Sequence, residues 1–408
     1  MKRVVITGMG GVSPLGDNWE DVFKNLKAKE NKVVQMPEWD KYKGLNTRLA
    51  VPVPYFETPE HYTRKQIRSM GRVSLLATRA TELALIDANL IDNKEIKDGS
   101  MGIAYGSSSG SPDAIGNFMM MRINGEVKGV TANTYVQLMS HTAAANVGIF
   151  FNLKGRIIPT CSACTSGSQG IGYAYESVKF GRQVMMVAGG AEELCATEAA
   201  VFDTLYAASI KNDTPKLTPR PYDRDRDGLV VGEGAGTMVL EELSHAQARG
   251  AHIYAEIIGY GTNSDGYHST QPIAETMQGA MKLSLADAKL KPDAIGYINA
   301  HATSTSVGDV AESRATNALF GNKIPISSLK SYMGHTLGAC GALEAWMTIQ
   351  MMNNDWYSPT INLDNVDEEC AELDYIMGDG REMQNEYVMT NNFAFGGINT
   401  SLIFKRWR

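Results

Sequence analysis

Residues 2–13 read KRVVITGMGGVS, and residues 255–264 read AEIIGYGTNS. Each segment is a short run rich in β-branched residues that ends in a glycine-containing turn, which is typical of a buried strand and the loop after it. A second pair of segments also matches in pattern, because residues 159–180 and 327–352 each run from a strand through a turn of small residues into a long helix. The two pairs indicate that the chain repeats one α/β unit.

A third pair of segments extends this repeat. Residues 229–240 and 396–404 each carry glycines followed by a β-rich run. Strands that alternate with amphipathic helices favour parallel sheets whose faces are covered by helices. We therefore predict an α/β fold of two duplicated halves, residues 1–250 and 251–408, which meet near the polar segment that ends at Gly250.

The composition is that of an ordinary globular protein. The chain has 408 residues, 43% hydrophobic and 20% charged, which is long enough for two core-sized units. Its net charge of −7 argues against nonspecific nucleic-acid binding. The first apolar run stops at Ile6, too short for a signal sequence, and no later run is long enough to span a bilayer. Five cysteines do not predict a disulfide scaffold in a chain of this length, so we expect a reducing, cytoplasmic compartment.

Residues 160–167, TCSACTSG, lie between a predicted strand and a predicted helix. A thiol at Cys164 would face the unpaired N–H groups at the helix start, which favour the thiolate and can stabilise an oxyanion during acyl transfer. Two other interpretations stay open on this segment alone. Cys161 and Cys164 have the spacing of a redox pair or half a zinc site, although no second cysteine pair or spaced histidine pair completes four ligands, so we predict no metal. Cys164 could also be a buried packing residue.

Two of the seven histidines stand out by their position. His301 follows the predicted strand in YINAHATST, residues 297–305, and His335 ends SLKSYMGH, residues 328–335. Ligand sites of parallel sheets gather at the carboxyl ends of the strands. A single histidine in such a place is more often structural, but two of them in the half opposite a candidate thiol favour a functional site.

Five motifs closely resemble the β-ketoacyl-[acyl-carrier-protein] synthases I and II, in the same order and across essentially the whole chain. They are ACTSG around Cys164, RPYDRDRDGLVVGEGAG at residues 220–236, the His301 loop with Gly308 and Asp309, KSYMGH at residues 330–335 followed by LGA, and NFAFGGIN at residues 392–399. The resemblance implies the thiolase-like fold, two α/β halves in a five-layered αβαβα arrangement. It agrees with the duplication predicted above.

The resemblance also implies a decarboxylative Claisen condensation. Cys164 would take an acyl group from an acyl carrier protein as a thioester, and His301 and His335 would assist decarboxylation of malonyl-ACP, whose carbanion attacks that thioester. The acyl chain grows by two carbons. By the same resemblance Lys330 is an active-site lysine, and Asp309 and Glu344 are supporting carboxylates.

Further roles are implied for residues around this centre. Phe395 matches a gating phenylalanine whose backbone N–H forms the oxyanion hole with that of Cys164. Several residues are expected to contact substrate or its pantetheine arm: Thr270, Thr303, Thr305, Phe393 and Ser109. Ser109 falls where elongating synthases often carry a bulky apolar residue in the acyl pocket, while Ala302 and Ala394 replace glycines that are common in the family. These departures suggest a substrate unlike a plain saturated chain.

The family implies partners rather than a bound cofactor, since its substrates travel on the phosphopantetheine arm of acyl carrier protein. The basic residues expected to dock that carrier are Arg64, Lys65, Arg68 and Lys128, although Ser69, Val127 and Tyr206 are non-basic where the family patch is basic. A dimer is expected. It is either a homodimer or a heterodimer with a chain-length-factor-like subunit, because the motif details also resemble ketosynthases of bacterial type II polyene pathways.

Other interpretations are less consistent with the residues. A noncatalytic chain-length-factor-like subunit would lack the nucleophile, whereas Cys164, His301 and His335 are all present. A chain-initiating synthase resembles Cys-His-Asn and would place asparagine at His335. A biosynthetic thiolase would carry a second cysteine near Gly396 and Gly397, where this chain has none.

Overall fold

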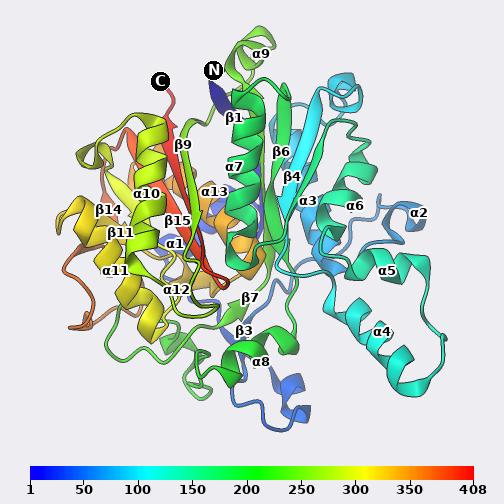
Figure 1. Ribbon diagram of the computed structural model, residues 1–408, viewed down its shortest axis with the longest axis horizontal. Coiled ribbons are helices and arrows are strands. Elements are labelled where there is room, and N and C mark those ends of the chain that lie inside the picture. The colour runs from blue at the N-terminus through cyan, green and yellow to red at the C-terminus, as the bar shows by residue number, and fades with distance from the viewer.

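Eleven strands form one sheet at the centre of the computed structural model, which describes residues 1–408 (Figure 1). Their order across the sheet is β13-β11-β10-β15-β16-β9-β1-β8-β6-β4-β5. The strands are β1 (Val4–Val12), β4 (Met101–Gly106), β5 (Ile157–Thr160), β6 (Met185–Glu192), β8 (Gly234–Glu242), β9 (Ala255–Ser264), β10 (Tyr297–Asn299), β11 (Pro325–Ser327), β13 (Asp374–Tyr375), β15 (Tyr387–Ala394) and β16 (Ile398–Arg406). Two small sheets hold β2 (Val34–Gln35), β3 (Leu49–Val51) and β7 (Val231–Gly232), and β12 (Trp356–Tyr357) and β14 (Arg381–Glu382).

Thirteen helices lie around this sheet and between its two halves. They are α1 (Trp19–Lys27), α2 (Arg64–Ile67), α3 (Arg72–Asp87), α4 (Pro112–Asn124), α5 (Ala132–Leu138), α6 (Thr142–Phe151), α7 (Ser166–Lys179), α8 (Ala196–Thr204), α9 (Leu243–Ala248), α10 (Ala274–Ala288), α11 (Ser306–Phe320), α12 (Lys330–Met333) and α13 (Cys340–Asn353). None of them is long and apolar enough to cross a membrane.

The two halves repeat the same strand order. The first half runs β5-β4-β6-β8-β1 and the second β11-β10-β15-β16-β9, and they join where β1 pairs with β9. Each of the three sequence repeats falls on corresponding elements, for example on β5 with α7 and on β11 with α13. The predicted duplication is therefore confirmed as a feature of the fold. The exact division at residue 250, after α9, stays a prediction.

The sheet is mixed rather than parallel, which corrects one expectation. β4 is parallel to both β5 and β6, and β10 to both β11 and β15, whereas β8 and β16 run antiparallel to their neighbours. The reason is the length of the connections, since β15 and β16 are joined by a tight turn at Phe395–Gly397 rather than by a crossover helix.

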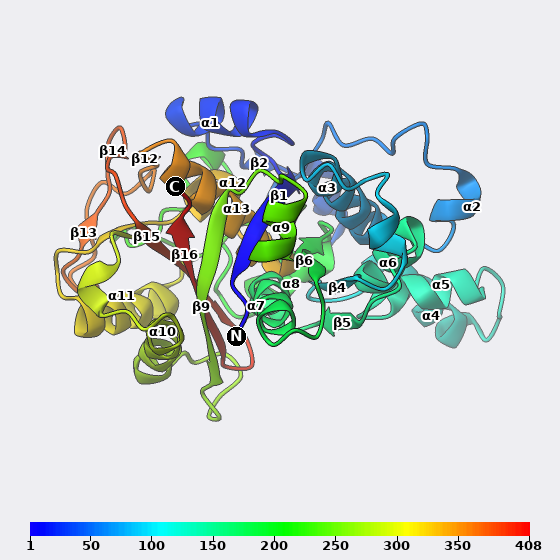
Figure 2. The same ribbon diagram turned by 90° about the horizontal axis from the view of Figure 1, so that it is seen from above.

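The two halves of this one sheet lie on either side of α7 and α13, so the elements stack as five layers, helices–half-sheet–helices–half-sheet–helices, which can be followed from side to side in Figure 1 and from above in Figure 2. α3 and α6 cover the outer face of the first half, and α10 with α11 covers the second. α7 and α13 lie between the two halves and contact both. This is the thiolase-like fold that the sequence predicted.

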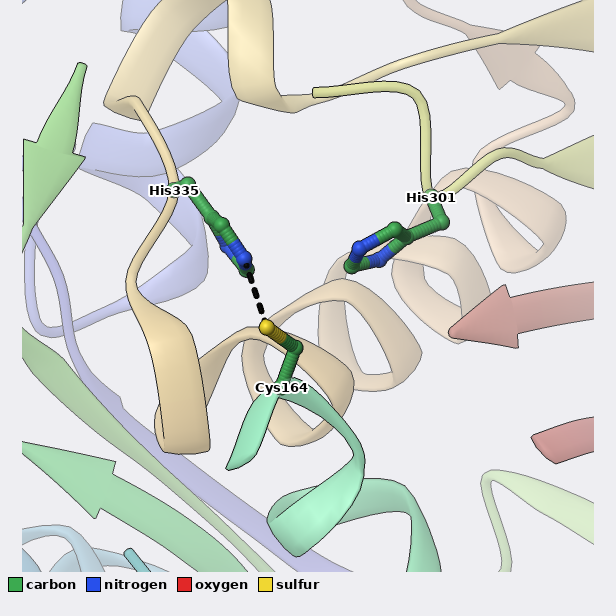
Figure 3. Close-up of side chains that lie close together, drawn as sticks. All are labelled: Cys164, His301 and His335. Atoms are coloured by element: carbon green, nitrogen blue, oxygen red, sulfur yellow. Dashed lines mark hydrogen bonds between the residues drawn. The ribbon is translucent and has the colours of Figure 1, made fainter. Parts of the chain in front are cut away.

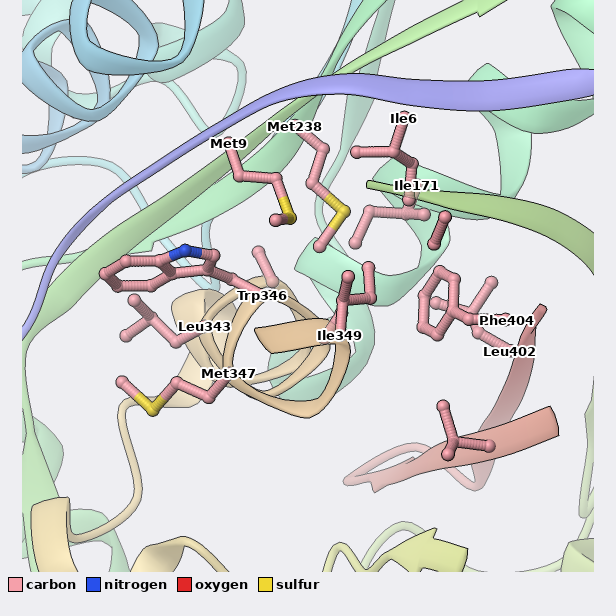
Figure 4. Packing of buried hydrophobic residues seen from close by; sticks show 14 of the residues in the cluster. Ile6, Met9, Ile171, Met238, Leu343, Trp346, Met347, Ile349, Leu402 and Phe404 are labelled. Carbon is pink, nitrogen blue, oxygen red and sulfur yellow. The ribbon is translucent and has the colours of Figure 1, made fainter. Parts of the chain in front are cut away.

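The central helices are buried because their side chains are small or apolar on nearly every face. Leu343, Trp346 and Met347 of α13 pack among Met9 of β1 and Met238 of β8 (Figure 4). Small residues let α7 and α13 approach closely, since a Cβ added at Gly167 would lie 2.9 Å from the backbone nitrogen of Ala342. The starts of α7 and α13 are thereby brought together, and the candidate site lies there.

Candidate active site

Cys164 lies in a tight turn between β5 and α7. Its neighbour Ala163 has φ of +51°, an unusual conformation for a residue with a side chain, and a short 3-10 turn over Ala163–Thr165 leads directly into the helix. The turn is held by its own hydroxyls: Thr165 Oγ1 donates to the Ser162 carbonyl at 2.7 Å, and Ser166 Oγ donates to the Ala163 carbonyl at 2.7 Å. The strand-to-helix turn that the sequence predicted is present, with Cys164 buried at its tip.

His335 meets the thiol from the second half of the chain. It follows α12 and Gly334, whose φ of +65° turns the backbone toward the first half. The His335 N–H donates to the Val230 carbonyl at 2.7 Å, and the Gly232 N–H donates to the His335 carbonyl at 2.9 Å. Anchored in this way, His335 Nε2 lies 3.0 Å from Cys164 Sγ (Figure 3).

His301 completes the group from the loop after β10. The backbone N–H groups of His301 and Ala302 donate to the two carboxylate oxygens of Glu312 at 2.8 and 2.7 Å, which fixes the loop. The ring centroids of His301 and His335 are 5.2 Å apart, and the two ring planes are nearly perpendicular. Cys164 Sγ and one nitrogen of each ring lie within 4.8 Å of one another. These three are also atom types that can ligate a metal ion.

A buried ion pair supports the histidines from behind. Lys330 Nζ is paired with Glu344 Oε1, and Asn392 Nδ2 donates to Glu344 Oε2 at 2.8 Å. The same Asn392 nitrogen lies 3.4 Å from His301 Nδ1. Burial lowers the pKa of Lys330, but the attraction of Glu344 outweighs this and holds that pKa above its usual value. A fixed positive charge therefore stands beside the two imidazoles.

Both imidazoles are neutral at physiological pH. Burial, and then the charge of Lys330, hold the pKa values of His301 and His335 well below the usual range. A neutral imidazole can donate an N–H bond and accept a proton, the two properties that general acid–base chemistry requires.

The thiol of Cys164 is also neutral, contrary to the expectation that the helix start would favour a thiolate. Burial raises the pKa of Cys164 to about 12, although Lys330 and the backbone N–H groups of Phe395 and of Cys164 itself act in the opposite direction. Desolvation is the stronger effect because Cys164 as a residue is only 5% exposed. The resting pair is thus a thiol hydrogen-bonded to an imidazole.

A cavity of about 440 Å³ opens from these three side chains to the surface. Four of the residues expected to contact substrate line it, together with the gate residue: Thr270, Thr303, Thr305, Phe393 and Phe395. Phe395 packs against Phe202 with ring centroids 5.2 Å apart. Ser109 is not among the lining residues and lies in the loop between β4 and α4. Its role stays a prediction.

The supporting carboxylates occupy different places. Glu344 belongs to the ion pair behind the histidines, whereas Asp309 lies in the first turn of α11 and accepts the Tyr222 and Ser304 N–H groups at 2.8 and 3.1 Å. Asp309 thus ties the His301 loop to the segment around Tyr222. The sequence reasoning missed Glu312, which holds the His301 backbone. Glu312 lies three residues after Asp309 in α11, so the two carboxylates share one face of that helix, but no local pattern in the sequence marks Glu312 as the acceptor.

The four basic residues expected to dock the carrier are exposed but lie apart from the cavity. Arg64 and Lys65 are in α2, Arg68 follows it, and Lys128 is in the loop after α4. In Figure 1 α2 and α4 are at the side of the molecule opposite α10 and α11, whose preceding loops line the cavity. Within one chain they do not border its mouth, and their docking role stays a prediction.

Comparison with known proteins places the whole chain among one group of enzymes. The family described as Beta-ketoacyl synthase, N-terminal domain, matches residues 1–246, and Beta-ketoacyl synthase, C-terminal domain, matches residues 254–364. The chain is 39% identical to 3-oxoacyl-[acyl-carrier-protein] synthase 2 of Vibrio cholerae, over 99% of each chain, and 37% identical to synthase 1 of Escherichia coli K12, over 100% of this chain and 99% of that one.

Solved structures give the same result. A β-ketoacyl synthase from Burkholderia phymatum is 62% identical to this chain with a TM-score of 0.99, and the match covers 100% of both chains. The ishigamide ketosynthase/chain length factor is 29% identical with a TM-score of 0.92, again over 100% of both.

Proposed function

The chain belongs to the β-ketoacyl synthase family, and on that premise we propose that Cys164, His301 and His335 carry out its condensation reaction. Enzymes of this kind join an acyl group to the two-carbon unit of malonyl-ACP with loss of CO2. The single observation that supports the assignment most is the 3.0 Å contact between Cys164 Sγ and His335 Nε2 at the inner end of a cavity that His301 also lines.

In the first half-reaction Cys164 takes the acyl group. Sγ attacks the carbonyl carbon of the acyl-carrier thioester while its proton passes to His335 Nε2, within direct reach at 3.0 Å. The backbone N–H groups of Cys164 and Phe395, which already favour negative charge at this position, stabilise the oxyanion. The carrier leaves as a thiolate and takes back the proton, so that a Cys164 thioester and a free carrier thiol result.

In the second half-reaction malonyl-ACP enters the emptied cavity. His335 now has no thiol partner, and once its ring proton has moved from Nδ1 to Nε2 by exchange with water it can donate an Nε2–H. Asn392 Nδ2 approaches His301 Nδ1 at 3.4 Å, which leaves the His301 proton on Nε2. The two N–H groups bind the malonyl thioester oxygen as CO2 departs and enolate charge develops there. The carbanion attacks the Cys164 thioester, and the Cys164 thiolate leaves and is reprotonated as β-ketoacyl-ACP forms.

Lys330 and Asp309 act through other residues. Lys330 is paired with Glu344, and its charge adds to the burial that lowers the pKa values of both imidazoles, so we assign it as a positioning residue. Asp309 is also a positioning residue, because it holds the loop that carries His301.

Phe395 has the features of a gate. It sits beside Gly396 and Gly397, whose φ values of +86° and +68° lie where glycine is favoured. We propose that its ring moves away from Phe202 when the pantetheine arm passes Thr303 and Thr305. No cofactor beyond that carrier-borne arm is proposed.

Two features support the proposal that the chain works as a dimer. β5 is an edge strand of the central sheet, and the apolar side chains of Ile149 and Ile157 next to that edge are 69% and 48% exposed. A second copy, or a chain-length-factor-like subunit, would cover them. In such a dimer the basic residues of α2 would lie beside the cavity of the partner subunit. They could then dock a carrier there, although they lie apart from the cavity of their own chain.

The polyene subtype and a cytoplasmic location are proposed on narrower grounds. Ala302, Ala394 and Ser109 depart from the common elongating pattern, and all five cysteines are free, as a reducing compartment requires.

Intact-protein mass spectrometry tests the proposed function. After incubation with acyl-ACP the protein should gain the mass of one acyl group, and malonyl-ACP should then remove that mass and yield β-ketoacyl-ACP. Cys164→Ala should gain no mass, whereas the control Cys161→Ala should behave as wild type. An unmodified wild-type protein with every carrier would support the noncatalytic subunit instead.

A further inference from the structure

Several buried polar atoms near the Cys164 turn have no hydrogen-bond partner. They are Ser162 Oγ, Glu192 Oε1, and both carboxylate oxygens of Glu198. Glu192 is completely buried, and its other oxygen accepts the N–H groups of Ser108 and Gly338 at 2.8 and 3.0 Å. An unpartnered buried carboxyl oxygen is costly, and each such group in a folded protein calls for an explanation, such as a ligand that completes its bonding.

Glu198 lies on α8, and the course of this helix shows where Glu198 is placed relative to the cavity. Beyond the end of this helix, Leu205 and Tyr206 are 45% and 93% exposed and line the mouth, and Phe202 lines the cavity further in. Glu198 precedes Phe202 by four residues, so it lies on the same face of the helix, roughly 6 Å further from the mouth. Cys164 packs in one apolar cluster with Ala199 and Phe202 of this helix.

During the condensation, the α8 side of Cys164 is free to hold the acyl chain. The carrier arm of the second substrate must reach the Cys164 thioester through the open cavity, past Thr303 and Thr305. The acyl chain cannot occupy the same space at the same time. It can instead extend from Sγ along the apolar cluster that Cys164 shares with α8, which leads away from the mouth and toward Glu198.

We propose that Glu198, with Glu192 and Ser162, forms a polar recognition site for the acyl group held by Cys164. The site selects acyl chains that carry a hydroxyl or another hydrogen-bond donor, because a hydrocarbon chain would leave its oxygens unpaired. This inference rests on the proposed role of Cys164 as the acyl acceptor.

The protonation of the pair fits such a ligand. Burial, and then the charge of Glu192, raise the pKa of Glu198 well above its usual range, and burial raises the pKa of Glu192 to about 7. Near neutral pH the pair keeps at least one proton. It can therefore both donate to and accept from a hydroxyl group, as a recognition site for an alcohol requires.

Competitive acylation of Cys164 tests the proposal. Short, medium and long saturated acyl-carrier thioesters, each with and without a terminal hydroxyl, are offered as matched pairs, and the two Cys164 thioesters are separated by mass. Wild type should favour the hydroxylated member of at least one pair. Glu198→Leu should reduce that preference by about tenfold or more, while acylation by the plain chain is kept or improved. The preference of Glu198→Gln should lie between those of wild type and Glu198→Leu. Thr197→Leu, on the exposed face of α8, should show the same preference as wild type.

Thermal unfolding of the free proteins provides a readout independent of catalysis. Glu198→Leu removes a buried carboxyl that has no partner, so it should raise Tm, whereas loss of a structural carboxyl would lower it. A lowered Tm, or an unchanged preference in both Glu198 variants, would overturn the inference. If wild type forms no thioester with any carrier, the proposed function fails, and the Tm comparison still decides whether Glu198 is a structural group.

Discussion

Cys164 Sγ and His335 Nε2 are 3.0 Å apart although 171 positions separate the two residues in the chain. They are brought together by the duplication, because α7 and α13 start at equivalent places in the two halves and pack against each other. One start supplies the sulfur, and the loop just before the other supplies the imidazole. The site therefore exists only where the two halves meet.

Alkylation kinetics should reveal the protonation state of this pair. Because burial raises the pKa of Cys164 to about 12, the thiolate fraction rises about tenfold for each pH unit through the neutral range. The rate of Cys164 modification by iodoacetamide, followed by mass in a Cys161→Ala background, should rise in the same proportion from pH 6 to pH 9. A rate that levels off in this range would instead indicate a preformed thiolate–imidazolium pair.

Substitution of the two histidines should separate the half-reactions. His335 contacts the thiol and His301 does not, so His301→Ala should still form the Cys164 thioester and lose condensation by about a hundredfold to ten-thousandfold. His335→Ala should slow both steps. Single-turnover acylation and β-ketoacyl product formation are measured side by side. Equal losses in both steps for the two variants would contradict this division of roles.

Loss of the Lys330 charge should move the pH dependence of condensation. Burial and Lys330 depress the pKa values of both histidines, so wild-type kcat/KM should persist below pH 6.5, where an ordinary histidine protonates. In Lys330→Met these pKa values rise, and the acid limb should move to higher pH. Lys282→Met, on the exposed side of α10, is the control. If the acid limb of Lys330→Met lies at the same pH as that of wild type, burial alone keeps the imidazoles neutral.

The Lys330–Glu344 pair should show strong coupling in stability. Lys330→Met leaves Glu344 buried without its counterion and should reduce the free energy of unfolding by about 3–5 kcal/mol. Lys330→Met combined with Glu344→Leu removes both charges, and it should recover a large part of that loss. Denaturant unfolding of the two single variants and the double variant measures the coupling. Additive losses would mean that the two side chains do not interact.

Much of the site was predictable from local sequence. The turn around Cys164 and the loops of His301 and His335 combine a strand pattern with small residues, and such patterns depend only on near neighbours in the chain. The duplication was visible for the same reason. The acidic partner Glu312 was not, because a carboxylate on a helix looks the same whether it faces water or holds a backbone loop.

The sequence by itself determined that the fold has two related halves, and it singled out Cys164, His301 and His335 as the candidates for the chemistry. The tertiary structure decided the protonation of Cys164 and both histidines, the mixed direction of the strands, and the unpartnered oxygens of Glu198. These properties depend on desolvation and on distances between segments far apart in the chain. Both are fixed only when the two halves pack together, so no local pattern contains them.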